Sequence, residues 1–385
     1  MASPQVKPLQ EICLQTVAAN FAVSPSLAYL PEAHLSKLIS LLSLELPLEL
    51  AGTVIDSEEY WKRRAISTWS NCQASGYCQS WKQLYFQRYV EAQLEKFDPA
   101  TSDFNELKRL LTFSSKFVNS LHLQQLPSHL DLQIVFEAMR SGIAHFSLTY
   151  GLRNTGMNYD RAMFGMKLPD CRSLAKTLEK SETLVTLGLP SNLLEDDKIR
   201  MIASGLVDNH SVTSLDLSHN KIADRGVRAL VKVLDSSNVV TFLDLHDNQI
   251  HVEGGQALAR AMRANHSLVS LNLRLNRLGD VGCSAICSAL SDNTILERLS
   301  LSANGAGPQT AEALSTVLRS NATLREVDLS ANSLGVAAGR MLREAVAENM
   351  ALERLDVRLS GVAEDEENAI ADILQNRLLE QAQQK

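Results

Sequence analysis

Aspartate recurs at one position of a repeated segment and is the first candidate for chemistry in this 385-residue chain. The segment reads Leu-x-Leu-x-x-Asn, and its first x is Asp216, Asp244, Asp328 or Asp356, with Asn272 in the same place. A column of carboxylates on one surface could bind a basic partner or a cation. The alternative is that Asp between two strand leucines is ordinary for this type of repeat, and we favour that alternative.

Basic and histidine side chains fall in the same part of the repeats. Arg274 and Arg358 lie two positions beyond the column, and Arg298 and Arg354 flank two of the segments. Mixed charge is expected of a surface that binds another protein. The predicted partner-binding residues are Asp216, His219, Asp244, His246, Arg274, Arg298, Asp328 and Arg358.

Other reactive side chains do not form a known catalytic or metal-binding pattern. His246, Asp247 and His251 lack the spacing of a metal-ligand set, and Cys72-x5-Cys78 is equally weak. The sequence contains no P-loop, G-x-S-x-G or H-E-x-x-H motif. We therefore predict no catalytic, cofactor-binding or metal-binding residues, and a protein that is not an enzyme.

The segments that carry these residues form an array with an exact period. Seven of them begin 28 residues apart between Leu187 and Leu355, and the landmark Asn recurs from Asn192 to Asn332 before Ser360 replaces it. Such a period is the signature of a leucine-rich-repeat solenoid. The predicted parallel strands, all on one sheet, are 187–189, 215–217, 243–245, 271–273, 299–301, 327–329 and 355–357.

The second half of each repeat has the periodicity of a helix. After Asp224, the apolar residues Val227, Leu230, Val231 and Leu234 recur at helical spacing. Strands stack about 4.8 Å apart, whereas helices need about 10 Å. The array must therefore curve, with its strands on the concave side, into an α/β horseshoe.

Divergent segments lie on both sides of the regular repeats. Two irregular repeats centre on Leu121-His-Leu123 and Phe146-Ser-Leu148, and the long interval that follows predicts a loop around 154–165. Before them, Leu9, Ile12, Cys13, Val17 and Phe21 make one helical face, and aromatic-rich helices follow. The predicted domains are a small all-α domain at 1–118, the solenoid at 119–362 and a C-terminal capping helix at 363–385, in which Ile370, Ile373, Leu374 and Leu378 face one way.

Composition limits the class of protein. A net charge of −7 and a pI near 5.8 argue against nucleic acid as the main partner. The first ten residues lack the apolar core of a secretory signal, and the most apolar run, 39–55, contains two Glu and a Pro, so no membrane span is expected. The six cysteines form no disulfide framework, which favours a reducing, intracellular compartment.

The repeat resembles the ribonuclease-inhibitor type, which Ran GTPase-activating proteins and innate immune receptors share. The segments before it, PLQEICLQTVAANF, LPEAHLSKLISLL, YWKRRAISTW and WKQLYFQRYVEAQLEKFDP, resemble the T-complex-associated testis-expressed protein family. That family is the leucine-rich-repeat subunit of the nexin–dynein regulatory complex of motile cilia and flagella. The resemblance implies a structural and regulatory axonemal protein without cofactors. Its partners would be other subunits of that complex, with a second leucine-rich-repeat subunit as a candidate.

The same N-terminal residues allow a different interpretation. Pro8-Leu9-x3-Cys13-x3-Val17 fits the loose pattern of an elongin-binding box, and LPEAHLSKLISLL with a later Trp-Lys resembles an F-box. Either motif would indicate a substrate receptor of a ubiquitin ligase, with the horseshoe holding the substrate. Both motifs are short and apolar, so ordinary helix packing also explains them.

Overall fold

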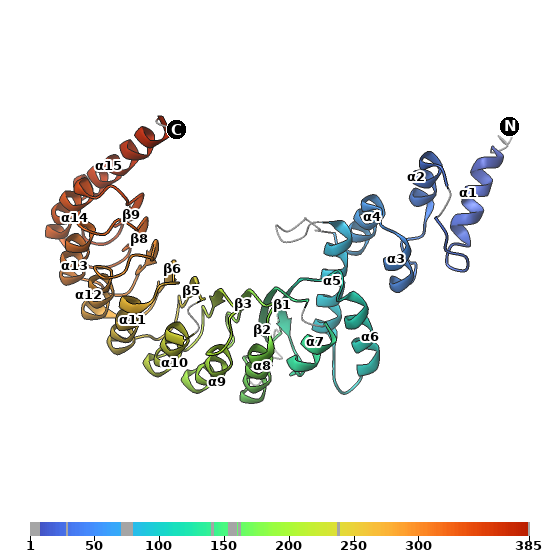
Figure 1. The fold of residues 1–385 in the computed structure, drawn as a ribbon, viewed down its shortest axis with the longest axis horizontal. Helices are drawn as coiled ribbons and strands as arrows, with labels where there is room; N and C mark the ends of the chain where they lie inside the picture. The colour runs from blue at the N-terminus through green and yellow to red at the C-terminus, as the bar shows by residue number, and fades with distance from the viewer. Residues whose placement is uncertain are drawn as a thin grey trace.

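The computed structural model of the chain describes residues 8–27, 30–70, 80–139, 142–152, 160, 163–236 and 239–383. Its central feature is one sheet in which nine parallel strands, β1 to β9, follow one another in sequence order. Figure 1 shows these strands along the inner side of an arc and the helices along its outer side. The predicted α/β horseshoe, with helices before it, is confirmed.

The strands are short, and each regular repeat contributes one. They are β1 (Ser120–Leu126), β2 (His145–Tyr150), β3 (Thr186–Gly188), β4 (Ser214–Asp216), β5 (Phe242–Asp244), β6 (Ser270–Asn272), β7 (Arg298–Ser300), β8 (Glu326–Asp328) and β9 (Arg354–Asp356). From β3 onwards, each strand begins and ends one residue earlier than predicted. The chain already turns after Asp216, because the Asp216 carboxylate accepts a hydrogen bond from the N–H of Ser218.

Helices pack on the outer side of every strand. They are α7 (Leu132–Ala138), α8 (Leu168–Lys180), α9 (Asp196–Leu206), α10 (Asp224–Ser236), α11 (Val252–Ala264), α12 (Gly279–Ala289), α13 (Pro308–Leu318) and α14 (Val336–Glu348). In α10, Val227, Leu230 and Leu234 are buried as predicted, while Val231 is half-buried. The apolar face of each helix thus packs against the leucines of the strand in the same repeat.

The landmark asparagines join consecutive repeats through their side chains. The Asn220 amide donates to the carbonyl oxygens of Leu189 and Leu217, both at 2.9 Å, and its Oδ1 accepts from the N–H of Asn192 and Leu194, both at 3.0 Å. Asn248, Asn276, Asn304 and Asn332 donate in the same way. Each amide therefore satisfies backbone groups that would otherwise be buried without partners.

A second row of asparagines stabilises the turns between helix and strand, and the repeat analysis missed it. Asn265 donates to the carbonyl of Leu234 at 3.0 Å, and its Oδ1 accepts from the N–H of Ser267 and Leu268. The row comprises Asn209, Asn265, Asn293, Asn321 and Asn349. The sequence signal was available, since these residues also share the 28-residue spacing.

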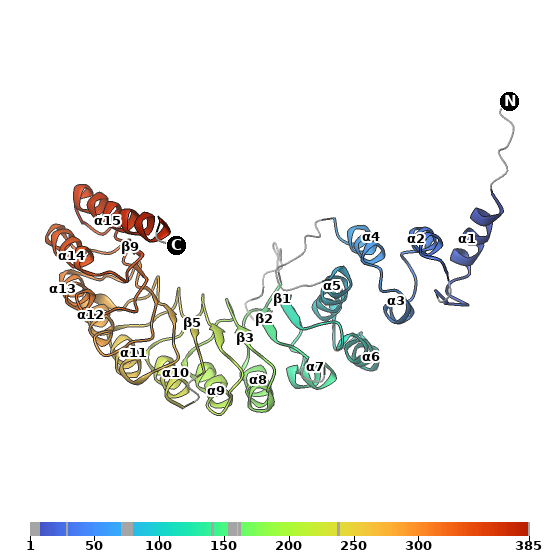
Figure 2. The same cartoon turned by 45° about the horizontal axis from the view of Figure 1, so that its top comes forward.

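The last helix, α15 (Glu364–Gln383), covers the end of the solenoid beyond α14 (Figure 2). Ile370 and Leu374 are buried there, as predicted. The expectation for Leu378 was wrong, because that side chain is exposed. Arg377 takes the buried position instead, and its guanidinium donates to the carbonyl oxygens of Leu352 and Val346. The cap thus provides hydrogen-bond donors for two carbonyls at the end of the solenoid.

Six helices precede the sheet in the part of the chain that the structure describes. They are α1 (Leu9–Ala19), α2 (Glu32–Leu41), α3 (Leu48–Val54), α4 (Glu58–Thr68), α5 (Trp81–Lys96) and α6 (Phe104–Ser114). Trp61 of α4 is fully buried against the rings of Tyr85 and Phe86 of α5. One hydrophobic core runs from these helices into the solenoid. The domain boundaries proposed from the sequence remain predictions.

Two expectations about the N-terminal helices need correction. In α1, the buried residues are Leu14 and Ala18, with Phe21 just beyond the helix, whereas Leu9, Ile12, Cys13 and Val17 are exposed. The second concerns the basic run Lys62, Arg63 and Arg64, since three consecutive basic residues favour a solvated helix face. Arg64 is instead buried, because its guanidinium donates to the carbonyl of Leu46 at 2.8 Å. Short amphipathic helices allow more than one face to pack, so sequence spacing alone chose the wrong one.

Two predicted features fall mainly outside the described residues. They are most of the loop around 154–165 and the Cys72-x5-Cys78 segment between α4 and α5. Within the described residues, no helix combines the length and apolarity that crossing a membrane requires.

Helix α5 covers the free edge of the sheet at β1. The Glu91 carboxylate accepts a hydrogen bond from the N–H of His122 at 2.8 Å, and Glu95 accepts from the N–H groups of Gln124 and Gln125. Edge strands left open invite pairing with other chains, and these carboxylates occupy donors on that edge. Burial outweighs the hydrogen bonds and raises the pKa of Glu91 from 4.5 to about 7.

We predict that Glu91→Gln stabilises the protein at pH 8 and that this advantage shrinks towards pH 5. Because folding raises the pKa of Glu91, this carboxyl takes up a proton at a higher pH in the folded state than in the unfolded state. The free energy of unfolding of the wild type therefore rises as the pH falls from about 7 to 4.5. Above pH 7, the buried carboxylate of Glu91 is ionised and lowers the stability of the protein. Urea unfolding of both proteins at the two pH values measures the difference. The lowered pKa of His122 acts in the opposite direction in both proteins. An advantage that grows towards pH 5 would contradict the assignment.

Replacing Leu245 with Ala should lower the free energy of unfolding by about 2–5 kcal/mol, because it leaves a cavity between the strand and helix layers. Leu245 is completely buried. Leu275→Ala is the control, since that leucine is 43% exposed in the next repeat and should cost less than about 0.5 kcal/mol. Denaturant midpoints compare the two variants, and equal losses would refute the packing described here.

Candidate functional site

The register of the sheet places the recurrent acidic residues in one row on the concave face. Asp216 pairs with Asp244, Asp244 with Asn272, Asn272 with Ser300, Ser300 with Asp328, and Asp328 with Asp356. We call these six residues the concave column. The position predicted for its members is confirmed, and Ser300 is an additional member that the sequence analysis did not name.

Most side chains of the concave column have a structural role. Each of the four aspartates and Asn272 accepts a hydrogen bond from the N–H two residues further on, at 2.9–3.1 Å. These contacts hold the turn that leads out of each strand, as Asp and Asn commonly do. The structure thus gives the recurrence of Asp a local cause, which agrees with the interpretation that we favoured.

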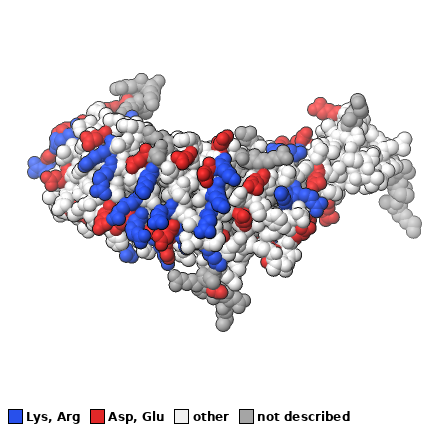
Figure 3. Space-filling model, turned by 60° about the horizontal axis from the view of Figure 1, so that its bottom comes forward, with Lys and Arg blue, Asp and Glu red and all other residues white. Residues whose placement is uncertain are grey.

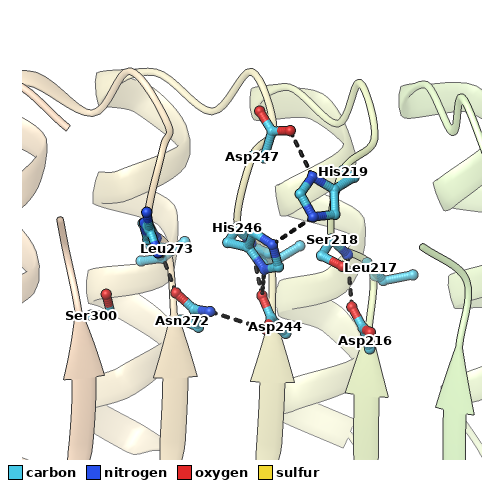
Figure 4. Close-up of polar contacts among 12 residues, drawn as sticks. Asp216, Leu217, Ser218, His219, Asp244, His246, Asp247, Asn272, Leu273 and Ser300 are labelled. Carbon is cyan, nitrogen blue, oxygen red and sulfur yellow. Dashed lines mark hydrogen bonds and ion pairs between the residues drawn. The ribbon is translucent and has the colours of Figure 1, made fainter. Parts of the chain in front are cut away.

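Two histidines stand above the column and contact each other. The Nε2 atoms of His219 and His246 are 2.9 Å apart, and their rings meet edge to face with centroids 4.3 Å apart. His219 Nδ1 lies 2.7 Å from the Asp247 carboxylate, and His246 Nδ1 lies 2.7 Å from that of Asp244 (Figure 4). Asp244 also accepts from the Asn272 amide at 3.0 Å. These five residues form the histidine cluster.

The hydrogen bonds of the histidine cluster orient both rings. An ionised carboxylate can only accept, so Nδ1 of each ring is the donor to its carboxylate, and the two Nε2 atoms face each other. Such an arrangement fixes both rings and presents donors and acceptors side by side, which suits a polar protein contact.

A left-handed backbone conformation orients the side chains of two members of the histidine cluster. His219 and Asp247 occupy the same position of successive repeats and have φ values of +55° and +52°. Left-handed backbone is unfavourable for most residues other than Gly. The array imposes it before every landmark Asn and before Ser360, since Ser191, Leu275, Ala303, Ala331 and Leu359 share it. The ladder of asparagines thus stabilises a turn that raises His219 next to His246.

The predicted arginines are not brought together. Arg274 is exposed, and no ion pair of its side chain is found among the described residues, while Arg298 lies beside Glu297 at 3.7 Å. Arg358 instead donates to the Asp356 carboxylate, which lowers the pKa of Asp356 despite its burial. Asp328 accepts from Ser300 at 3.2 Å. The site is therefore a series of separate polar groups along the concave face.

The described residues offer no clustered metal ligands. No group of three or more His, Cys, Asp or Glu side chains in that part of the chain could hold a metal ion. Cys283 and Cys287 of α12 are completely buried, and desolvation raises both thiol pKa values, that of Cys287 to about 12. At neutral pH these thiols stay protonated and pack as small apolar groups.

Comparison with known proteins agrees with this architecture. The family pattern described as Leucine Rich repeat matches residues 208–231, 236–259 and 264–287. A solved internalin from Listeria monocytogenes aligns with 71% of this chain and 75% of its own, at 16% identity and a TM-score of 0.41, which is too low to support a conclusion about fold or function. The chain is a leucine-rich-repeat protein.

Sequence relatives are more specific. Dynein regulatory complex subunit 5 of Chlamydomonas reinhardtii is 51% identical over 202 residues, which are 52% of each chain. The proteins of the same name from Mus musculus and Homo sapiens are 36% and 34% identical, over 52% of this chain and 45% of theirs. The chain thus spans about half the length of these relatives. Over this part of the chain it is similar to proteins named dynein regulatory complex subunit 5, in agreement with the resemblance found in the sequence.

Removing Asp244 should destabilise the protein more than removing Asp216. Asp244→Ala leaves His246 and Asn272 without their acceptor in a half-buried position, at a cost of about 1–3 kcal/mol. Asp216→Ala is the matched control, because the only hydrogen bond found for its carboxylate in the described structure comes from the Ser218 N–H. Thermal and urea unfolding measure both variants. An equal or larger loss for Asp216→Ala would show that the histidine cluster does not form.

Proposed function

We propose that this chain is a non-catalytic structural and regulatory subunit of the axonemal nexin–dynein regulatory complex. In this role it binds neighbouring subunits, including a second leucine-rich-repeat subunit, and supports the control of dynein in cilia or flagella. The observation that carries the proposal is the 51% identity to a dynein regulatory complex subunit 5. The absence of a catalytic motif in the sequence and the polar concave surface both support it.

The concave face is proposed as one binding surface. The histidine cluster lies on β4 to β6 and the turns that follow them, near the middle of the sheet, and Arg274 follows directly after β6. Its exposed guanidinium is available to a carboxylate of a partner. Arg298, Asp328 and Arg358 extend the polar surface towards the C-terminal end. Groups of this kind set specificity and orientation in a protein interface.

Arg274→Glu should weaken assembly into the complex several-fold, because it puts a repelling charge at the centre of the concave face. The variant is expressed in ciliated cells that lack their own subunit 5. Retention in detergent-extracted axonemes and crosslinking to other subunits are then measured. Arg277→Glu is the matched control, since it makes the same charge change in the same repeat, beyond the landmark Asn276. If both variants are retained at the wild-type level, Arg274 is not part of the interface.

Arg358 needs a milder variant. Reversing its charge would place a carboxylate against Asp356, so a folding defect and a binding defect would be confused. Arg358→Gln keeps a donor near Asp356 and removes the charge.

For the whole protein, we expect that deletion impairs ciliary beating while the dynein arms remain. Normal beating after deletion, together with no axonemal retention, would overturn the proposed function.

A ubiquitin-ligase receptor is the second candidate, and one observation favours its elongin-binding form. Leu9, Cys13 and Val17 of the box pattern are exposed on α1, with Leu9 at 76%, so an adaptor could reach them. The F-box-like segment is less accessible, because Leu38, Ile39 and Leu42 are buried. Co-purification with elongin that Leu9→Ala and Cys13→Ala abolish, together with client levels that rise on deletion, would establish this function.

A further inference from the structure

A groove lies on the convex side of the solenoid, away from the concave site. It runs between α9 and α10 and is bordered by Leu168 at the start of α8. Its floor is apolar, with Met201 and Val207 half-buried and Ala229 buried. Leu168 is 47% exposed at its edge. An extended or helical segment could thus cover apolar surface that this chain leaves in contact with water.

Cations border the groove and continue onto the neighbouring helices. The repeat period places Arg172, Arg200 and Arg228 at the same position of α8, α9 and α10, and all three are exposed. Lys232 and Arg260 are equivalent to each other on α10 and α11, and Arg225 completes the border of the groove. Figure 3 shows Lys and Arg side chains running in rows over this side of the molecule.

The acidic residues nearby neutralise only part of this charge. Asp197 lies 3.5 Å from Arg225, and Glu253 lies 2.5 Å from Arg228. Both pairs are largely exposed, so their mutual attraction is weak and a partner can replace it. Arg200 and Lys232 have no ion pair among the described residues, although both line the groove. A net positive border therefore faces solvent in a chain of net charge −7.

We propose that this groove binds an acidic amphipathic segment of a partner protein. Its apolar side chains would cover Met201, Val207 and Leu168, and its carboxylates would meet Arg200, Arg228 and Lys232. The charge complementarity is local. At physiological salt the Debye length is about 8 Å, so the overall negative charge of the chain barely opposes contact at the groove. The apolar floor distinguishes this partner from a simple polyanion.

The test uses the full chain and a labelled synthetic peptide. The peptide is a helix of about 20 residues with Glu on one face and Leu on the other, and binding is followed by fluorescence anisotropy at low and physiological salt. A second peptide replaces every Leu with Ser. We expect the first peptide to bind at least about tenfold more tightly, since both charge and apolar burial contribute. Equal binding of the two peptides would overturn the proposal.

Matched variants locate the site. Arg200→Glu combined with Lys232→Glu should weaken peptide binding by about tenfold or more, as expected when two attractive charges become repulsive. Arg277→Glu combined with Lys108→Glu makes the same charge change outside the groove, at exposed residues without an ion pair in the described part of the chain, and should have less than a twofold effect. Equal losses in both double variants would show a general charge effect and refute the groove. Leu168→Ser should weaken the Leu-containing peptide only, and no change would contradict the apolar contact.

Two further measurements complete the test. Unfolding midpoints confirm that the variants are folded, and Lys232→Gln replaces the double variant if that one is not. A DNA duplex and anionic lipid vesicles serve as alternative ligands. Tighter binding of either one than of the peptide would overturn the proposal. The result is independent of axonemal assembly, because the residues of the groove lie on the side opposite the concave face.

Discussion

The structure depends on one repeated interaction, the hydrogen bonding of each landmark asparagine to the backbone of the preceding repeat and of its own repeat. Asn220 contacts groups of two repeats at once, through both its amide and its oxygen. Because the next repeat carries the same residue 28 positions later, each repeat is held in register by its neighbour. The register of the parallel sheet follows from this contact between adjacent repeats, while the curvature follows from the wider spacing of the helices.

Charged side chains contact the backbone at both ends of the described sheet. Beyond β9, the guanidinium of Arg377 in α15 donates to carbonyls of the last repeats. At β1, Glu91 and Glu95 of α5 accept hydrogen bonds from its N–H groups. In both places a charged side chain replaces contacts that a neighbouring repeat makes elsewhere in the sheet. The raised pKa of Glu91 is the electrostatic consequence of that replacement.

The same constraint separates the surfaces of the molecule. The strand positions between the buried leucines must face the concave side, and there they carry the concave column and the histidine cluster. The exposed positions of the helices must face the convex side, where the 28-residue period aligns Arg172, Arg200 and Arg228. One period therefore produces two surfaces of different character, and each can bind a different partner without disturbing the core.

By itself the sequence determined the repeat, the order of the strands, the curvature and the row of aspartates, because a fixed period and alternating side chains leave little freedom. It did not determine which face of α1 packs, since a short helix offers several apolar faces. Nor did it determine that Arg64 and Arg377 are buried, because their guanidinium groups donate to backbone carbonyls that only the fold brings near. The contact between His219 and His246 also required the tertiary structure. It depends on the left-handed turn at residue 219 and on the spacing of neighbouring strands, which join residues far apart in the chain.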